Sequence, residues 1–309
     1  MSEVGRGTAF ARAALAGNPS DMYGGRTLAM VLRCFAASAT ARFAERDELG
    51  PPGEGGDRLL AGALARFRRA FGVREPVALG CTTSVPREVG LGGSSAIVIA
   101  CTRALCALHR RDFEPDELAA HALAVELDLG IAAGLQDRIV QAREALVAMN
   151  FGSEGRPLCE ELDESLLPAL VVAWHPEAAG PSGVAHAPLR ERHSRGDPEV
   201  VNAIERLTTA AARAREALVD GDLKQFAECV DASYDERCRL MPVHTRVREM
   251  VDAVRNAGGS ANSAGSGGAI VGTQPVKDGW RERLEAGGAR VIVLDPVSSR
   301  PDEILYPRS

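Results

Sequence analysis

The sequence contains no block of Lys or Arg and no long, uninterrupted apolar run. Acidic residues outnumber basic ones by 42 to 36, whereas a nucleic-acid-binding surface normally carries a basic stripe, so no nucleic-acid partner is expected. Residues 1–13 lack the apolar run that a signal peptide needs. The most apolar stretch, 96–108, is interrupted by Thr102 and Arg103 and is too short to span a bilayer. These absences predict a cytoplasmic protein without a membrane partner.

The chain also lacks a Cys-x-x-Cys pair and any Cys/His cluster at metal-ligand spacing. Its 7 cysteines are odd in number, which favours reduced, mostly structural thiols over a disulfide framework. What is present is an ordinary globular composition, with 45% apolar and 25% charged residues among 309. A chain of this length can form one large domain or two medium ones, each with a substantial core.

Strand-like and helix-like patterns are mixed along the chain, which predicts an α+β fold with two lobes. Strands are expected at 8–15, 27–35 with a continuation to 43, 76–85, 169–174 and 290–294. Helices are expected at 59–71, 96–108, 115–129, 198–219, 223–239, 243–257 and 276–285. A polar, glycine-containing domain boundary is expected within 152–165, and a loop rich in Pro, Gly, His and Arg at 178–197.

A predicted strand, a glycine-serine run and an apolar helix follow one another between residues 76 and 108. Glycines let the backbone come close to a ligand, and the free N–H groups of a first helical turn favour an anion. The run from Gly90 to Ser95 is therefore a candidate phosphate-binding loop. It is not the nucleotide loop GxxxxGK[ST], because no Lys follows, and it lacks the GxGxxG of dinucleotide folds. Taken alone, a glycine turn with a serine N-cap explains GxGG equally well.

The full string PREVGLGGSSA at 86–96 resembles the second motif of the galactokinase, homoserine kinase, mevalonate kinase and phosphomevalonate kinase (GHMP) superfamily, and is most similar to that of glucuronokinases. Four further stretches support this resemblance in family order: ARAALAGNPSD at 11–21, ELDLGIAAGLQDRIVQ at 126–141, SGxxHxxxRxR at 182–192 and GSGGA at 265–269. The resemblance implies the two-lobed GHMP kinase fold. An N-terminal lobe like domain 2 of ribosomal protein S5 would cover 1–158, and a ferredoxin-like lobe 159–309. ATP and substrate would lie in the cleft between them.

The resemblance also implies transfer of the γ-phosphate of MgATP to a hydroxyl, which needs the phosphate charge neutralised and the acceptor placed in line. Asp137 would face that hydroxyl and accept its proton, while Ser94 and Glu126 would hold Mg²⁺. Arg12 lies in an apolar strand, where an unpaired charge is costly, so it is expected to meet Asp137 or a phosphate and to keep Asp137 ionised. The residues expected to bind ATP are Pro86, Gly90, Leu91, Gly92, Gly93, Ser94, Ser95, Gly265, Ser266, Gly267 and Gly268.

The predicted substrate is a sugar or sugar acid. Arg binds carboxylates well through its planar fork, so Arg190 and Arg192, with His186, are candidates for holding a carboxylate. For each arginine taken singly, a solvated basic loop is an equal alternative. Asn18, Ser20 and Asp21 are expected to contact the sugar or the nucleotide ribose, with a turn cap as the alternative. Tyr23 is also expected to bind the substrate.

The acceptor implied by the resemblance is glucuronate, phosphorylated at its anomeric hydroxyl. The protein is expected to be a monomer or a homodimer. Some positions depart from the glucuronokinase pattern. Asn262 and Ala264 stand where those enzymes tend to carry Lys and Thr, and Val184 and Arg26 each replace a Lys. Two alternatives therefore stay open: a GHMP kinase for another sugar or a mevalonate-like alcohol, and a non-catalytic ligand-binding member of the fold.

Overall fold

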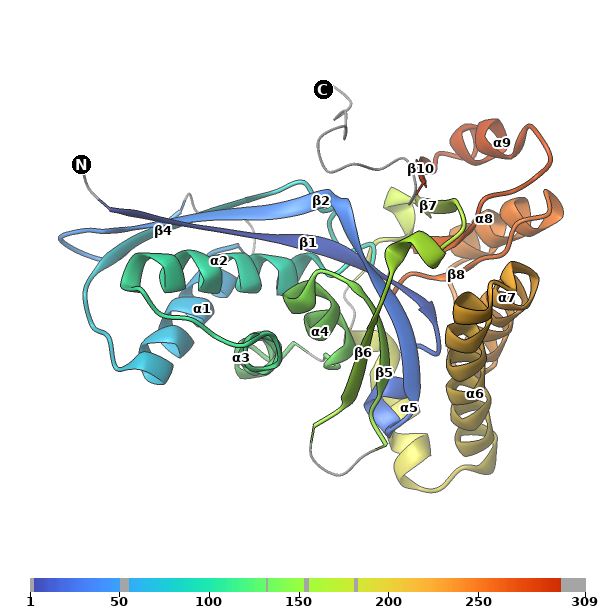
Figure 1. Cartoon of the computed structure of the whole chain (residues 1–309), viewed down its shortest axis with the longest axis horizontal. Helices are drawn as coiled ribbons and strands as arrows, with labels where there is room; N and C mark the ends of the chain where they lie inside the picture. The colour runs from blue at the N-terminus through green and yellow to red at the C-terminus, as the bar shows by residue number, and fades with distance from the viewer. Residues whose placement is uncertain (1–2, 51–55, 132, 153–155, 181–182, 296–309) are drawn as a thin grey trace. The chain divides into compact units, whose positions relative to one another are not determined.

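The computed structural model describes residues 3–50, 56–131, 133–152, 156–180 and 183–295, with the backbone alone at 56–57 and 183–187. Its helices and strands are labelled in Figure 1. The chain forms two compact units, each assembled from separate parts of the sequence. Unit 1 contains Met1–Arg12, Val31–Pro86 and Gly92–Glu144, and unit 2 contains Ala13–Met30, Arg87–Leu91 and Ala145–Ser309. The predicted division into family domains at residue 158 stays a prediction.

The strands of unit 1 are built around two long strands, β1 (Val4–Ala16) and β2 (Arg26–Phe43), which continue into unit 2. Residues 37–43 of β2 pair antiparallel with β4 (Val77–Thr83), and β3 (Glu48–Leu49) pairs parallel with β4. The strands predicted at 8–15, 27–43 and 76–85 are thereby confirmed, with small changes of length.

The described residues of unit 1 form the helices α1 (Gly56–Phe71), α2 (Gly93–His109), α3 (Pro115–Asp128) and α4 (Gln136–Arg143). Figure 1 shows α2 alongside β1. A Cβ on Gly5 would lie 2.1 Å from the carbonyl oxygen of Ala104, so glycine is what lets the α2 backbone approach the strand. The first three helices were predicted. The pattern does not predict α4, because its polar residues are buried through pairing and leave no apolar stripe.

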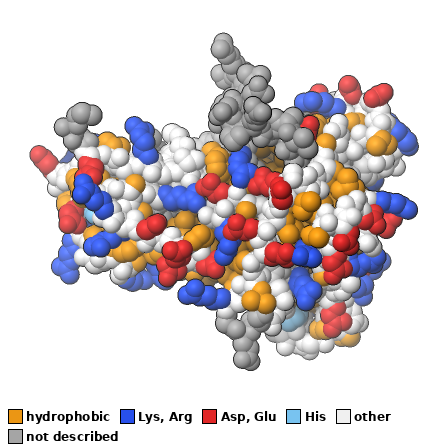
Figure 2. All heavy atoms as spheres, in the orientation of Figure 1, with side chains coloured by type: hydrophobic (Ala, Val, Ile, Leu, Met, Phe, Trp, Pro, Cys, Tyr) orange, Lys and Arg blue, Asp and Glu red, His pale blue; other side chains and the backbone are white. Residues whose placement is uncertain are grey.

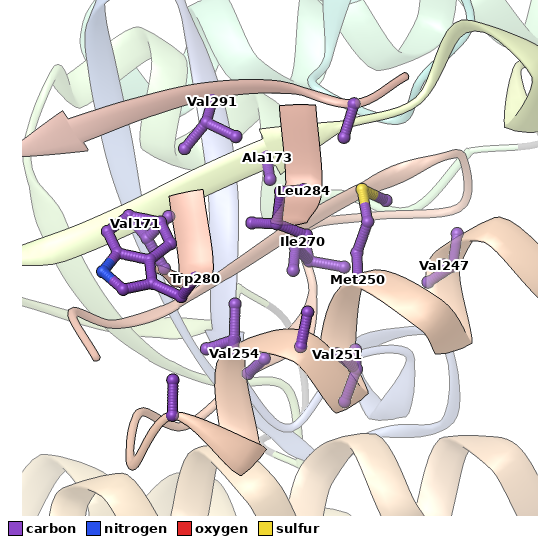
Figure 3. Packing of buried hydrophobic residues seen from close by; sticks show 14 of the residues in the cluster. Val171, Ala173, Val247, Met250, Val251, Val254, Ile270, Trp280, Leu284 and Val291 are labelled. Carbon is purple, nitrogen blue, oxygen red and sulfur yellow. The ribbon is translucent and has the colours of Figure 1, made fainter. Parts of the chain in front are cut away.

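Unit 2 contains an antiparallel sheet in the order β10 (Arg290–Leu294), β7 (Leu170–Trp174), β9 (Ala269–Thr273) and β8 (Asn262–Ser263). Helices α8 (Thr245–Asn256) and α9 (Trp280–Ala286) pack their apolar side chains against it. Figure 3 shows this core, in which Ile270 of the sheet meets Val254 of α8 and Leu284 of α9. The strands predicted at 169–174 and 290–294 are confirmed. The last predicted helix begins at 280 rather than 276.

A β-hairpin of β5 (Leu146–Asn150) and β6 (Leu158–Leu162) also lies in unit 2, and β5 pairs with residues 26–29 of β2. β6 therefore lies inside the stretch expected to be a polar boundary. It has no apolar alternation, and Leu158 is 62% exposed, so the pairing of its backbone with β5 rather than side-chain burial makes it a strand.

Two predicted helices, α6 (Pro198–Asp220) and α7 (Leu223–Leu240), form an antiparallel pair in unit 2. The loop predicted at 178–197 is wrong, because α5 (Gly183–Ser194) occupies most of it. Pro188 lies inside this helix, where proline is normally disfavoured, yet Leu189 is buried in a cluster with Ile204 and Leu207 of α6. Tertiary burial therefore outweighs the local breaker signal. Short 3₁₀ helices occur at Ser20–Tyr23, Glu164–Leu166 and Pro176–Ala178.

Within the described part of the chain, no helix combines the length and apolar character needed to cross a membrane. All of the cysteines are free thiols. On the face shown in Figure 2, Lys and Arg side chains are interspersed with Asp and Glu.

Candidate active site

The candidate phosphate loop leads directly into α2, as predicted from the strand, loop and helix pattern. Gly92 is the N-cap of α2 with φ +74°, a left-handed conformation that favours glycine. Among the described residues no side chain caps this terminus. Ser95 is buried and donates its hydroxyl to the carbonyl of Gly92 at 3.1 Å, so it stabilises the turn. The first-turn N–H groups of α2 thus keep the orientation that suits an anion.

Gln141 of α4 holds this loop against β1. Its Nε2 donates to the carbonyl of Phe10 at 2.7 Å and to that of Gly92 at 2.9 Å. A Cβ on Gly92 would lie 3.0 Å from that nitrogen and 3.2 Å from Cγ of Arg12, so a larger residue would displace both neighbours. Gln141 was not predicted as a site residue, because a glutamine in a helix gives no chemical signal by itself.

Arg12 and Asp137 form an ion pair, as expected from the burial of an arginine in an apolar strand. Arg12 Nη2 lies 2.5 Å from Asp137 Oδ2, with the two side chains 4% and 20% exposed. Gln136 Nε2 donates to Asp137 Oδ1 at 3.2 Å. Burial by itself raises the pKa of Asp137, but the charges of Arg12 and Arg138 and the hydrogen bonds from Arg12 and Gln136 outweigh it. The pKa therefore lies below its ordinary value, and the carboxylate is ionised at neutral pH.

Ser94 and Glu126 lie together, as expected of a shared metal site. Ser94 Oγ donates to Glu126 Oε1 at 2.6 Å. Glu126 is fully buried rather than on the surface, because Arg138 Nε, at 2.6 Å, and Nη2 both donate to its other oxygen, Oε2. A hydroxyl and a carboxylate oxygen are hard ligands of the kind that Mg²⁺ prefers, so these two side chains fit that ion. Arg138 was not predicted, although it directly follows Asp137 in the sequence.

Gly90 of the candidate phosphate loop and Gly267 of the GSGGA stretch at 265–269 meet within unit 2. Gly90 has φ +83°, and a Cβ on it would lie 2.4 Å from the amide nitrogen of Gly267. A Cβ on Gly267 would lie 2.3 Å from the carbonyl carbon of Val89. The GSGGA stretch at 265–269 therefore packs against Gly90 of the candidate phosphate loop. The other predicted nucleotide-binding residues of this unit are half-buried (Ser266) or buried (Leu91, Gly265 and Gly268), and Pro86 and Gly93 of unit 1 are half-buried.

Asn18 and Ser20 of the N-terminal motif are buried in local hydrogen bonds. Asn18 Nδ2 donates to the carbonyl of Ser263 at 3.1 Å, and its Oδ1 accepts from Asn262 Nδ2 at 2.8 Å. Ser20 Oγ donates to the carbonyl of Arg26 at 2.7 Å. This geometry fits the turn-cap alternative for both residues. Asn262, which replaces a family lysine, secures the turn after β1.

Tyr23 and Arg190 are placed close to one another in unit 2. Burial raises the pKa of Tyr23, the charge of Arg190 opposes that rise, and Asp21, which is half-buried, adds to it. The Tyr23 ring lies 4.5 Å from that of His193, and its hydroxyl is buried without a hydrogen-bond partner among the described residues. Arg190 itself is exposed. Among the described residues, Arg190 forms no ion pair, unlike the predicted Arg12 and Arg192.

Arg192 is placed differently from Arg190. Its Nε donates to Asp197 at 2.8 Å and its Nη2 to Glu199 at 2.5 Å, so it ties α5 to the start of α6. The side chain of His186 lies outside the described residues. The sequence pattern could not separate the two arginines, because their partners lie beyond the motif.

Two family models match stretches of the chain that contain the candidate phosphate loop, Asp137 and the GSGGA stretch. The model for the GHMP kinases N terminal domain matches residues 58–143, and that for the GHMP kinases C terminal matches residues 214–273. The chain is 30% identical to Glucuronokinase 1 of Arabidopsis thaliana over 94% of this chain and 91% of that protein. The chain belongs to the GHMP kinase family.

Other relatives agree with that assignment. This GHMP kinase is 31% identical to Probable glucuronokinase 2 of Arabidopsis thaliana, over 85% of the chain and 82% of the relative. Its fold is similar to the structure of Lactococcus lactis galactokinase complexed with galactose, with a TM-score of 0.77 at 16% identity, over 95% and 93% of the two chains. The predicted GHMP kinase fold is thereby confirmed. The chain is a kinase that transfers phosphate to a hydroxyl, in a family that uses ATP, generally with Mg²⁺.

Proposed function

We propose that this GHMP kinase transfers the γ-phosphate of ATP to a sugar or sugar-acid hydroxyl, with glucuronate phosphorylated at its anomeric hydroxyl as the preferred reaction. The observation that carries the proposal is the Arg12–Asp137 pair at 2.5 Å, because it supplies an ionised carboxylate next to the glycine loop of unit 1. The similarity to two glucuronokinases supports the choice of acceptor.

Asp137 is the base of the proposed reaction. It orients the acceptor hydroxyl and accepts its proton as the phosphate is transferred. Its lowered pKa makes it a weak base. An anomeric hydroxyl is more acidic than an ordinary alcohol because the ring oxygen withdraws charge, so a weak base suffices. Arg12 fixes the orientation of the carboxylate through its hydrogen bond.

The phosphate groups are assigned to the N-terminus of α2. The first-turn N–H groups following Gly92 bind phosphate oxygens, and Ser94 Oγ and Glu126 Oε1, which lie 2.6 Å apart, are the side-chain atoms that would hold Mg²⁺. Mg²⁺ held there would supply positive charge to balance that of the phosphate oxygens. Within unit 2, the backbones of Gly90 and Gly267 lie in contact, so no side chain stands between these two segments.

The acceptor carboxylate is assigned to Arg190, with the hydroxyl of Tyr23 as a second polar contact. Arg190 is exposed and Tyr23 OH has no partner among the described side chains, so both have hydrogen-bonding capacity to offer. Arg192 is left out of this assignment because its guanidinium already binds two carboxylates.

A panel of acceptors tests the proposal by ADP release with MgATP. We expect turnover with glucuronate to exceed that with galacturonate, glucose or mevalonate, and ³¹P NMR to show an anomeric phosphate. Faster turnover with a neutral sugar or with mevalonate than with glucuronate would identify that compound as the preferred acceptor instead. Measurable ATP binding without turnover on any acceptor would favour the non-catalytic alternative.

A further inference from the structure

We infer that Arg138 is a positioning residue that commits one oxygen of Glu126 to an ion pair and leaves the other, Oε1, as the single oxygen through which this carboxylate holds a cation. The inference rests on the proposed function, since it concerns the Mg²⁺ that would accompany ATP. It assigns a role to a residue that the motif comparison did not single out.

The two oxygens of Glu126 have different environments. Oε2 accepts two hydrogen bonds from Arg138, from Nε at 2.6 Å and from Nη2. Oε1 accepts one from Ser94 Oγ at 2.6 Å and no other from the described side chains. Because both donors of Arg138 converge on the same oxygen, the carboxylate cannot rotate to offer both oxygens to a cation. A hydroxyl bond is the weaker restraint, so Oε1 is the oxygen that can change partner.

Arg138 is itself held in place, which a positioning role requires. It is buried, and its Nη1 donates to the carbonyl of Gly134 at 2.9 Å. The same nitrogen lies 3.4 Å from Asp137 Oδ2. One side chain therefore contacts both the carboxylate assigned to the metal and the carboxylate assigned to the acceptor, and sets the spacing between α3 and α4 at that point.

The charge balance of this cluster has a further consequence. Arg12 and Arg138 carry two positive charges, and Glu126 and Asp137 carry two negative ones, so the formal charge is zero. Nowhere in the described ranges do three or more His, Cys, Asp or Glu side chains gather as metal ligands. A neutral cluster in which one Glu126 oxygen lies outside the ion pairs attracts a divalent cation weakly, so the cation should bind together with the nucleotide phosphates rather than before them.

Both the role of Arg138 and the joint binding of cation and nucleotide can be tested by measuring Mn²⁺ binding. Electron paramagnetic resonance monitors this binding with a non-hydrolysable ATP analogue and no sugar. The variants are Arg138→Lys and Arg138→Gln, with Arg143→Lys as the matched control. Arg143 also belongs to α4 and pairs with a carboxylate, Asp116, at 2.7 Å, but that pair lies outside the site. Binding of the analogue in EDTA is measured in parallel.

We expect wild type and Arg143→Lys to bind Mn²⁺ equally with the analogue and weakly without it. Arg138→Lys should weaken Mn²⁺ binding in the ternary complex by about 10-fold or more, while changing analogue affinity in EDTA by less than about 2-fold. Wild-type Mn²⁺ affinity in both Arg138 variants would overturn the inference. The inference would also be overturned if the variants lost affinity equally for metal-free and metal-bound nucleotide, or if both variants failed to fold. Each of these results indicates a purely structural role.

The same measurements separate this inference from the proposed function. Wild type that binds Mn²⁺ with the analogue in an Arg138-dependent manner, but phosphorylates no sugar acid, would keep the positioning role and remove the acceptor assignment. If the wild type phosphorylates glucuronate while both Arg138 variants keep normal Mn²⁺ affinity, the acceptor assignment would be kept and the positioning role of Arg138 removed.

Discussion

Gly90 and Gly267 approach so closely that a Cβ on the first would lie 2.4 Å from the amide nitrogen of the second. Gly90 also has a left-handed backbone, with φ +83°. Two separate requirements for glycine therefore coincide at one position: backbone conformation and contact with another segment. They can be separated experimentally, because Gly221 has a similar φ of +73° but nothing within 4 Å of its Cβ position.

Gly90→Ala is expected to lower the free energy of unfolding by clearly more than Gly221→Ala. The Gly221 variant should lose about 1–2 kcal/mol from backbone strain alone, whereas the Gly90 variant must also push apart two backbone segments. Urea denaturation of both variants measures the difference. Equal losses of unfolding free energy would show that the contact between Gly90 and Gly267 can open without an energetic penalty.

Asp137→Asn should lower kcat for sugar phosphorylation by about 10³-fold, because an amide cannot accept the proton of the hydroxyl. ATP affinity should stay within about 3-fold, since the carboxylate is assigned to the acceptor. Asp128→Asn serves as the control, because Asp128 is an exposed acid at the end of α3 that pairs with Arg66. Near-normal kcat in the Asp137 variant would remove this residue from the mechanism.

Arg12→Gln should move the acid limb of the kcat profile to higher pH. Arg12 helps to hold the pKa of Asp137 below its ordinary value of 3.8, so in the wild type the carboxylate stays ionised down to about pH 4. Without that charge, the effect of burial is opposed less strongly and the pKa of Asp137 rises. Activity should then begin to fall at a higher pH in the variant than in the wild type, beyond any uniform loss of kcat.

A matched control for this pH dependence is Arg42→Gln, since Arg42 forms an exposed ion pair with Glu48 at 3.3 Å. Its profile should follow that of the wild type. An unchanged acid limb in Arg12→Gln would mean that Asp137 does not titrate in the catalytic step.

Arg190→Ala should raise KM for glucuronate by about 10-fold or more and leave KM for glucose nearly unchanged, because the lost partner is a carboxylate. Arg192→Ala should affect the two acceptors equally, because Arg192 binds Asp197 and Glu199 rather than a ligand. Steady-state kinetics with both sugars compares the variants. A selective effect of Arg192→Ala instead would transfer the carboxylate contact to that residue.

His121 should make the folded state sensitive to acid. Burial lowers its pKa to about 4, and the ring is 7% exposed next to Phe113. In the unfolded chain this histidine binds a proton near pH 6.5, whereas in the folded chain it does not. Its contribution to the free energy of unfolding is therefore fully present above pH 6.5 and is lost as the pH drops toward 4. The wild type should lose about 2 kcal/mol from this group between pH 7 and pH 5. His121→Leu should lack that part of the loss in urea denaturation.

The sequence alone is sufficient to predict the features that depend on neighbouring residues. The strand, glycine loop and helix from 77 to 109 follow from local pattern, since alternation, glycine and helical spacing act over a few residues. The pairing of Arg12 with an acid also follows from composition, because a charge in an apolar strand needs a partner. The family motifs then associate these segments with phosphoryl transfer.

Only the tertiary structure decides which partner each polar group finds. A glutamate in a helix is usually exposed, yet Arg138 allows the full burial of Glu126. Arg190 and Arg192 are equivalent in the motif, but acids at the start of α6 bind just the second. β6 becomes a strand through its hydrogen bonds to β5, with no apolar pattern of its own. In each case the deciding contact joins residues that no local pattern relates, so burial and pairing had to be seen in three dimensions.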